Sequence, residues 1–174
     1  MLKKWCWAVL LGLLLTGCQA QPAWETVDDE MTEGVIQVIQ PPYRMTFGVP
    51  DEAVLEAFAS DEYRQVYFQE DGDYEIVSEA MTAGSIEDVV KEISGFSMDE
   101  MTVMKTERGA LPEYQFTWYS NSDNGGVISR ASVLGDGNYY YTLVFSVQED
   151  CGKEYEKTAK EVFSSFGIYY DEQF

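Results

Sequence analysis

The stretch that decides the fold is YYYTLVFSV, residues Tyr139–Val147. It is rich in aromatic and β-branched residues, as expected of a strand that packs on a hydrophobic core. Successive side chains of a strand point to opposite faces, so every second residue of this stretch shares one face. We therefore expect a core face made by Tyr139, Tyr141, Leu143, Phe145 and Val147.

Three further strands precede this one and form an antiparallel meander with it. Each is an apolar or β-branched run that ends in a cluster of Gly, Asn, Asp or Pro, which is typical of a strand followed by a turn. The expected strands are Met101–Glu107, Tyr114–Tyr119 and Ile128–Leu134, and the expected turns are 109–112, 121–126 and 135–138.

Four more strands are expected before the meander. Val35–Ile39 and Tyr43–Phe47 are separated by the strand-breaking pair Pro41-Pro42. Glu62–Gln69 and Tyr74–Ala80 flank Asp71-Gly72, a dipeptide that favours a hairpin turn.

Three helices are expected between and after these strands. Ser85 begins the clearest one, because Ile86, Val89, Val90 and Ile93 repeat at helical spacing and Gly95 ends the pattern. A C-terminal helix over 153–166 has an apolar stripe made by Tyr155, Ala159, Val162, Phe163 and Phe166. Pro50, followed by two acids, predicts a short helix over 53–58.

This order of elements predicts an α+β domain with a central antiparallel sheet. The expected strand Tyr114–Tyr119 carries large residues on both of its faces. A sheet with large residues on both faces must be covered on both sides, so we expect one amphipathic helix on each side of it.

The N-terminus has the features of an export signal. Lys3 and Lys4 precede a short apolar run, which ends in Leu15-Thr16-Gly17-Cys18. The arrangement resembles the bacterial lipoprotein signal, and the resemblance implies cleavage before Cys18, which then carries the lipid. An ordinary signal peptide or an uncleaved membrane anchor is the alternative interpretation. We expect a signal peptide over 1–17, a lipidated cysteine with an acidic tether over 18–33, and a single domain over 34–174.

Two segments of that domain resemble the PsbP-like family. One is the strand 137–145 with the helix that follows it and ends in Ser164-Ser165-Phe166, and the other is Tyr43–Pro50. The resemblance covers most of residues 35–168 and implies an α/β/α sandwich with a central antiparallel sheet. The family includes photosystem accessory subunits, a nuclear-import factor that binds a small GTPase, and bacterial lipoproteins. It implies binding and assembly rather than catalysis, and no functional residue carries over position by position.

The composition excludes one class of partner. The chain has 31 Asp and Glu against 11 Lys and Arg, a net charge of −20. Nucleic-acid binding needs clustered basic residues, so this charge argues against it. It argues equally against lying flat on an anionic membrane, so the lipid on Cys18 must provide the membrane attachment. The acidic surface keeps the protein soluble, or attracts cations or a basic partner.

The residues that usually carry catalysis are scarce. The chain has no histidine, which removes the commonest general base and the commonest ligand of transition metals. Cys151 is left without a disulfide partner in the mature chain, and the acids before it should raise the pKa of its thiol. The segments 121–126 and 71–73 weakly resemble cation loops, but turn chemistry explains their Asn, Asp and Gly residues better. We therefore predict no cofactor and no metal site.

Three aromatic residues form a candidate binding face. Tyr140 must point away from the core face of its strand, and with Trp118 and Tyr119 it could line a groove for a peptide or a glycan. Burial beneath a helix is the alternative use of the same side chains.

These observations lead to one functional expectation with two alternatives. We expect a lipoprotein on the extracytoplasmic face of the cell membrane, which binds an envelope protein and is not an enzyme. The alternatives are a lipoprotein that binds cations or a small ligand, and an enzyme of an unrecognised type.

Overall fold

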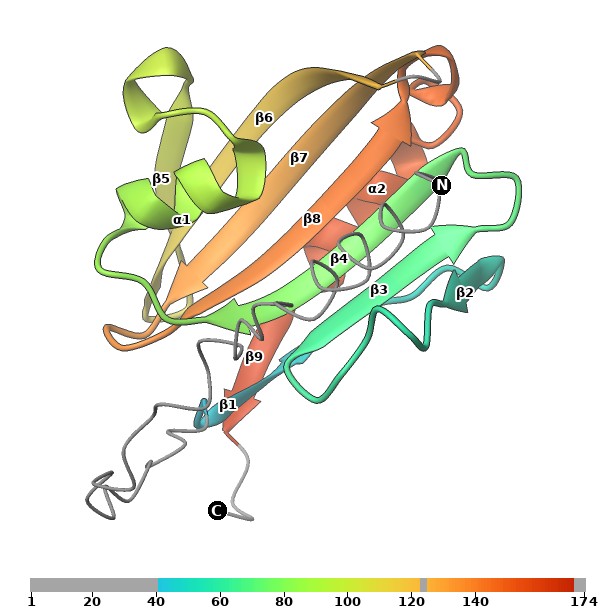
Figure 1. The fold of residues 1–174 in the computed structure, drawn as a ribbon. Coiled ribbons are helices and arrows are strands. Elements are labelled where there is room, and N and C mark those ends of the chain that lie inside the picture. Colours follow the sequence, from blue (N-terminus) through green and yellow to red (C-terminus); the bar gives the residue numbers. More distant parts are fainter. Residues whose placement is uncertain (1–40, 123–124, 171–174) are drawn as a thin grey trace, which may run out of the picture. The chain divides into compact units, whose positions relative to one another are not determined.

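Seven antiparallel strands form the central sheet of the domain, in the order β2-β3-β4-β8-β7-β6-β5 (Figure 1). The computed structural model describes residues 41–122 and 125–170, so the expectations for residues 1–40, including Cys18 and the strand Val35–Ile39, lie outside the described residues. The strands are β2 (Ala53–Leu55), β3 (Arg64–Gln69), β4 (Tyr74–Met81), β5 (Val103–Arg108), β6 (Leu111–Ser122), β7 (Gly125–Gly135) and β8 (Tyr140–Gln148).

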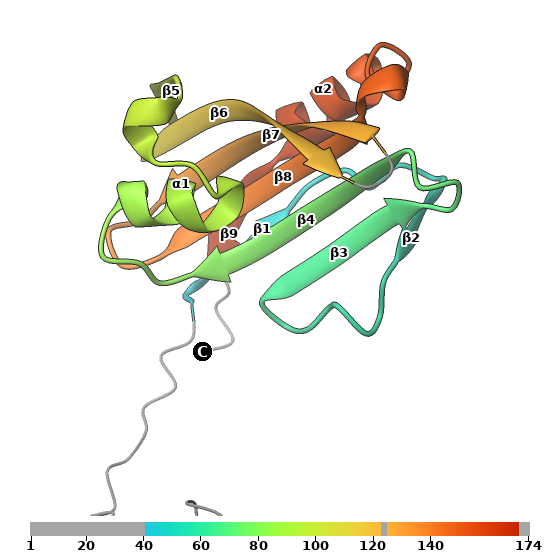
Figure 2. The same ribbon diagram turned by 45° about the horizontal axis from the view of Figure 1, so that its top comes forward.

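Two helices cover opposite faces of this sheet (Figure 2). The helix α1 (Ile86–Ser94) lies on one face and α2 (Glu156–Ser165) on the other. Two short 3-10 helices, η1 (Met98–Glu100) and η2 (Glu149–Cys151), lie in the connections. The expected α/β/α sandwich with a central antiparallel sheet is confirmed. None of the helices in the described ranges is long and apolar enough to cross a membrane.

Each face of the sheet has its own hydrophobic core. The α2 side buries the five residues predicted as a core face, four of them on β8 and Tyr139 just before it, each at most 8% exposed. The α1 side buries Val89 and Val90 of the helix against four sheet residues. These four are Phe116, Ala131, Val133 and Val144. The prediction that the sheet is covered on both sides is therefore confirmed.

Local signals fix the ends of α1 as expected. Ser85 Oγ accepts a hydrogen bond from the Asp88 backbone N–H at 3.3 Å, which satisfies one of the free donors of the first turn. Gly95 ends the helix in the left-handed conformation with φ of 79°, which glycine adopts without steric penalty.

The predicted hairpin and meander are confirmed with small shifts. Tyr67 pairs with Ile76 across the β3–β4 hairpin. The turn between β5 and β6 is shorter than predicted, because Leu111 pairs with Arg108 and already belongs to β6. The C-terminal helix begins at Glu156, three residues after its predicted start.

The short helix predicted over 53–58 is wrong. Residues Ala53–Leu55 form β2, which pairs with Tyr67–Gln69 of β3, and the chain then turns. A six-residue helix is too short to be stable by itself. The neighbouring strand offers backbone partners that the helix would lack, and the pairing prevails over the local signal at Pro50.

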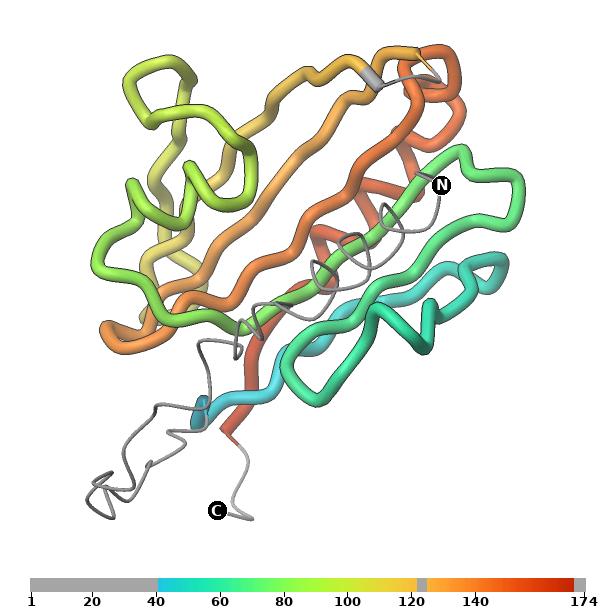
Figure 3. The backbone as a smooth tube through the Cα atoms, in the orientation of Figure 1, coloured from blue at the N-terminus to red at the C-terminus, as the bar shows by residue number. Residues whose placement is uncertain are grey.

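A small second sheet joins the two ends of the described chain and was not predicted. The strand β1 (Tyr43–Thr46) lies beside β9 (Gly167–Tyr170) and pairs with it (Figure 3). In this pairing Tyr43 is opposite Tyr170. This β1–β9 pair packs on the α2 side, where the Tyr43 ring meets the Tyr141 ring edge to face at 5.9 Å. The first and last strands of the described range therefore lie side by side.

Candidate functional site

A groove lies between α2 and the outer strands β5, β6 and β7. Its volume is about 640 Å³. Its lining includes Met104 and Arg108 of β5, Thr117 of β6, Arg130 of β7, and Lys160 and Phe163 of α2. We call it the α2 groove.

The local geometry of each element explains this lining. Thr117 and Arg130 are register partners on β6 and β7, so both lie on the face of the sheet that α2 covers. Glu156, Lys160 and Phe163 follow each other at spacings of four and three residues and form a second stripe on α2. The core stripe, with Ala159 and Val162, packs on the sheet and leaves this second stripe beside the outer strands.

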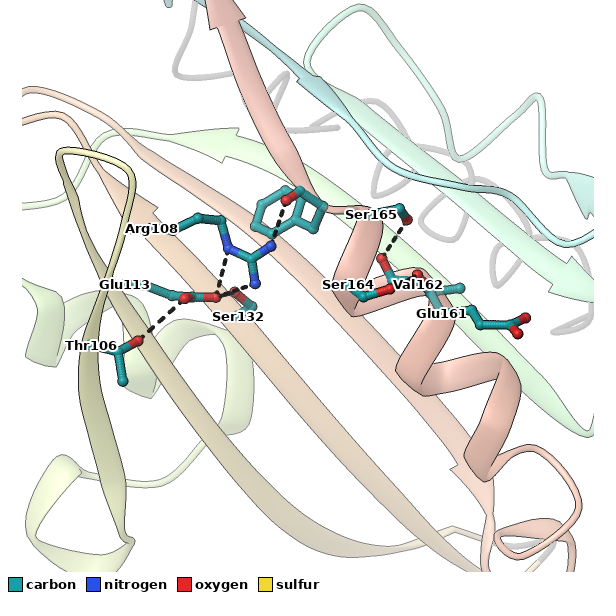
Figure 4. A network of polar contacts seen from close by, with 9 residues as sticks. Thr106, Arg108, Glu113, Ser132, Glu161, Val162, Ser164 and Ser165 are labelled. Atoms are coloured by element: carbon teal, nitrogen blue, oxygen red, sulfur yellow. Dashed lines mark hydrogen bonds and ion pairs between the residues drawn. The ribbon is translucent and has the colours of Figure 1, made fainter.

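A buried carboxylate anchors one end of the α2 groove (Figure 4). Glu113 is only 4% exposed, and Arg108 donates to its Oε1 from Nε at 3.1 Å and from Nη2 at 2.8 Å. Ser132 Oγ donates to the same oxygen at 2.7 Å, and Thr106 Oγ1 donates to Oε2 at 3.2 Å. A buried charge needs such partners to remain stable in the fold.

The surroundings of Glu113 keep it ionised. Burial raises the pKa of this carboxyl, but the hydrogen bonds from Arg108, Ser132 and Gln115 and the charge of Arg108 outweigh burial and lower it. Arg108 also donates from Nη1 to the Phe166 carbonyl oxygen at 2.8 Å, at the end of α2. The network thus ties β5, β6 and β7 to the point where α2 ends and β9 begins.

The rest of the α2 groove is cationic in a strongly acidic protein. Neither Arg130 nor Lys160 forms an ion pair or a side-chain hydrogen bond with any residue in 41–122 or 125–170. Glu156 is the one acidic residue that lines the groove within these ranges. Since Glu113 offsets Arg108, the groove keeps a small positive charge.

A second cavity, of about 480 Å³, lies where the β3–β4 turn and the start of β7 meet η2. Asp71 and Asp73 of the β3–β4 turn line it together with Glu149 and Asp150. Tyr155 donates to Asp73 Oδ2 at 3.0 Å, and burial together with this bond raises the pKa of Tyr155 to about 12. Within the described parts of the chain, no three His, Cys, Asp or Glu side chains are grouped so that they could hold a metal ion.

Cys151 also lines this second cavity. Burial, followed by the charge of Asp73 and a hydrogen bond to it, raises the pKa of the thiol. The predicted direction is confirmed, although Asp73 contributes more than the neighbouring acid Asp150. A thiol that stays protonated is a poor nucleophile and a poor metal ligand.

The three aromatic residues of the predicted binding face lie on two sides of the sheet. Trp118 and Tyr140 pack into the core on the α1 side, where Trp118 lies 5.6 Å from the Phe116 ring. Tyr119 follows Trp118 in β6, so it points to the α2 side and is 46% exposed. Its hydroxyl donates to Glu149 Oε2 at 2.9 Å. The structure therefore brings Trp118 and Tyr140 to one side without Tyr119.

The residues of the α2 groove were not predicted from the sequence. Arg108 and Glu113 flank a tight turn with strand residues on either side, and this was the one local signal available. Arg130 and Lys160 come from a strand and a helix 30 positions apart, and only the packing of α2 brings them to one groove.

Comparison with known proteins shows which solved structures share this fold. No family model and no curated protein sequence matches the chain. Among solved structures, cyanobacterial PsbP (CyanoP) from Synechocystis sp. PCC 6803 is similar with a TM-score of 0.50 and 14% identity, over 76% of this chain and 96% of that one. The Ran-binding protein Mog1p of Saccharomyces cerevisiae is similar with a TM-score of 0.47 and 10% identity, over 71% of this chain and 89% of that one.

A further similar structure is LpqN of Mycobacterium tuberculosis, described as involved in cell envelope biogenesis. It gives a TM-score of 0.44 and 9% identity, over 72% of this chain and 83% of that one. The likeness to cyanobacterial PsbP agrees with the layers, the helices and the sheet described above. The domain therefore has the PsbP-like fold. A shared fold does not by itself transfer a function.

Proposed function

We propose that this protein is a lipid-anchored, extracytoplasmic binding protein without catalytic activity, and that the α2 groove receives an acidic group of its ligand. The observation that carries the proposal is the pair Arg130 and Lys160, which line one groove and have no acidic partner within the described residues. A carboxylate or a phosphate is the chemistry that such a pair of cations recognises.

The net charge of −20 does not prevent an anion from binding in the groove. At physiological ionic strength, exposed charges beyond about 8 Å are largely screened. A bound group therefore responds mainly to the charges that line the groove, where Arg130 and Lys160 outnumber Glu156. Met104 and Phe163 add apolar surface for the rest of the ligand.

The chemistry of the groove favours binding over catalysis. Glu113 has a lowered pKa and accepts hydrogen bonds from Arg108, Ser132 and Thr106, so it is a weak general base. The Ser132 hydroxyl donates a hydrogen bond to Glu113, a weakly basic carboxylate that holds the hydroxyl in place without activating it as a nucleophile. With no histidine in the chain, the usual activating base is missing as well.

The anchoring part of the proposal depends on the N-terminal sequence. The apolar run that ends in Leu15-Thr16-Gly17-Cys18 supports cleavage and lipidation at Cys18. An acidic body is repelled by anionic lipids, so a lipid on Cys18 is the attachment that we propose. An envelope protein remains the proposed class of partner.

The groove is tested with small probes of opposite charge. The Cys18→Ser form, which we expect to leave the membrane, is titrated with hexanoate, hexyl phosphate and hexyltrimethylammonium while backbone amide shifts are followed by NMR. We expect the two anions to shift resonances of β7 and α2 and the cation to leave them unchanged. Binding should weaken about tenfold in Lys160→Gln and in Arg130→Gln, because each removes a charge-assisted contact.

Lys157→Gln is the matched control for this test. It makes the same change one turn away on the same helix, at a side chain that pairs with Glu161 at 3.4 Å and lies outside the groove. Binding that is equal in Lys157→Gln and Lys160→Gln, or equal for anion and cation, would contradict the proposal.

A further inference from the structure

The loop between β2 and β3 exposes an aromatic side chain completely. Phe58 is 102% exposed, whereas no other large apolar side chain of the described residues exceeds 59%. Val54 and Leu55 of β2, just before the loop, are 39% and 46% exposed. We call Glu56–Ser60 the Phe58 loop.

The exposure of Phe58 does not come from a loosely held loop. At one end, the Glu56 N–H donates to the Val66 carbonyl oxygen at 2.8 Å. At the other end, Ser60 Oγ accepts from the Val66 N–H at 3.0 Å. Within the loop, the Phe58 N–H donates to Glu56 Oε1 at 3.3 Å. Both ends are thus fixed to β3, so the backbone of the loop is held in place while the ring stays exposed.

The chain on both sides of Phe58 is strongly acidic in sequence. The segment 49–63 contains five carboxylates and no basic residue. They are Asp51, Glu52, Glu56, Asp61 and Glu62. Of the arginines on either side, Arg44 pairs with Glu62 at 2.7 Å and Arg64 lies 3.5 Å from Glu79. This charge disfavours insertion of the ring into an anionic bilayer.

We propose that the Phe58 loop is a docking site for a partner protein, with Phe58 entering an apolar pocket whose rim carries Lys or Arg. A preformed aromatic anchor loses little conformational freedom on binding, and aromatic anchors in pockets dominate the energy of many interfaces. Opposite charge around the pocket complements the five carboxylates and speeds the encounter. This surface is separate from the α2 groove and goes beyond the function proposed above.

The test places a photo-cross-linker at the loop in living cells. Phe58 is replaced by p-benzoylphenylalanine in the full-length chain, and the same replacement at Phe96, 39% exposed after α1, is the control. We expect an ultraviolet-dependent adduct with another protein at position 58 and none at position 96. The cross-linked partner peptide, mapped by mass spectrometry, should contain apolar residues next to Lys or Arg.

Two variants then separate the anchor from the charge. Asp51→Lys should reduce the adduct at least fivefold, because it reverses a charge at a side chain that holds no part of the loop. Phe58→Ala should abolish binding of the mapped partner to the purified protein while the melting temperature stays unchanged, since the ring makes no buried contact.

Four results would overturn the proposal. They are no adduct at position 58 beyond that at position 96, an adduct with lipid, a cross-link within the chain or to a second copy of it, and a partner contact that is polar or acidic.

Discussion

Arg108 and Glu113 lie on either side of the tight β5–β6 turn, and two nitrogens of the arginine donate to a single oxygen of the glutamate, at 3.1 and 2.8 Å. The third nitrogen reaches the Phe166 carbonyl oxygen, 58 positions along the chain. One side chain therefore neutralises a buried acid and also holds the end of α2. Its removal should affect the sheet and the helix together.

Arg108→Leu should lower the free energy of unfolding by about 3 kcal/mol, because Glu113 is then left buried and charged without its cation. Denaturation in urea, extrapolated to water, measures the change. Arg64→Leu is the control and should lose less than about 1 kcal/mol, since its pair with Glu79 is more than a third exposed on both sides. The double variant Arg108→Leu/Glu113→Leu should recover most of the loss. Equal losses of unfolding free energy in Arg108→Leu and Arg64→Leu would contradict this explanation.

The stabilisation from Glu113 should depend on pH. Its pKa is lower in the folded protein than the ordinary 4.5, so its contribution is complete above that value and is lost as the pH falls through the folded pKa. The difference in unfolding free energy between the wild type and Glu113→Gln should therefore shrink between pH 7 and pH 3.

Glu79 changes the unfolding free energy with pH in the opposite direction to Glu113. The effect of Glu113 must therefore be measured as the difference between the wild type and Glu113→Gln. Burial raises the pKa of Glu79, so its contribution weakens as the pH rises through that raised value. Subtracting the curve of Glu113→Gln removes this effect, because Glu79 is present in both proteins. A difference that stays constant over the whole range would mean that Glu113 does not titrate in the way described.

Ser165→Ala should destabilise the fold by about 1 kcal/mol. Its hydroxyl oxygen accepts from the Gly48 N–H at 2.7 Å and so connects the last turn of α2 with the chain that follows β1. Ser164→Ala is the matched control, because Ser164 Oγ donates only within its own helix, to the Glu161 carbonyl oxygen. Thermal unfolding of both variants measures the difference, and indistinguishable melting temperatures would rule out the connection as a source of stability.

Cys18→Ser should release the protein from the membrane. Acyl chains on Cys18 would contribute about 0.8 kcal/mol for each buried methylene group, which no acidic surface could replace. Cys151→Ser is the control and should remain membrane-bound. Partition between detergent and water phases distinguishes the two, and a Cys18→Ser protein that stays in the detergent phase would point to an uncleaved signal helix.

Elements with local signals were predictable from the sequence. The start of α1 at Ser85 and its end at Gly95 are determined by residues within or next to the helix. The meander followed from alternating side chains and turn residues. The strand β9 did not, because Gly167–Tyr170 has only four residues and exists through its pairing with β1, more than a hundred positions away.

The candidate site depended on details that the sequence leaves open. A four-residue turn was predicted between β5 and β6, and the true turn brings Arg108 opposite Leu111 and Thr106 opposite Glu113. That register decides whether the arginine can reach the glutamate. The α2 groove depends further on how far α2 lies over the outer strands, which is a matter of side-chain packing and not of any motif.

The β1–β9 pair has a mechanical consequence for an anchored protein. If the protein is anchored as we propose, a pull from the N-terminal side reaches the described strands first at β1, where the rung of Tyr43 with Tyr170 lies at the open end of the pair. A force applied there would separate the paired residues one after another along β1. The last pair to separate would be Thr46 with Gly167. Beyond it, the Gly48–Ser165 hydrogen bond would bear the pull before the main sheet does. The strands β1 and β9 can therefore separate under load while the seven-stranded sheet stays intact.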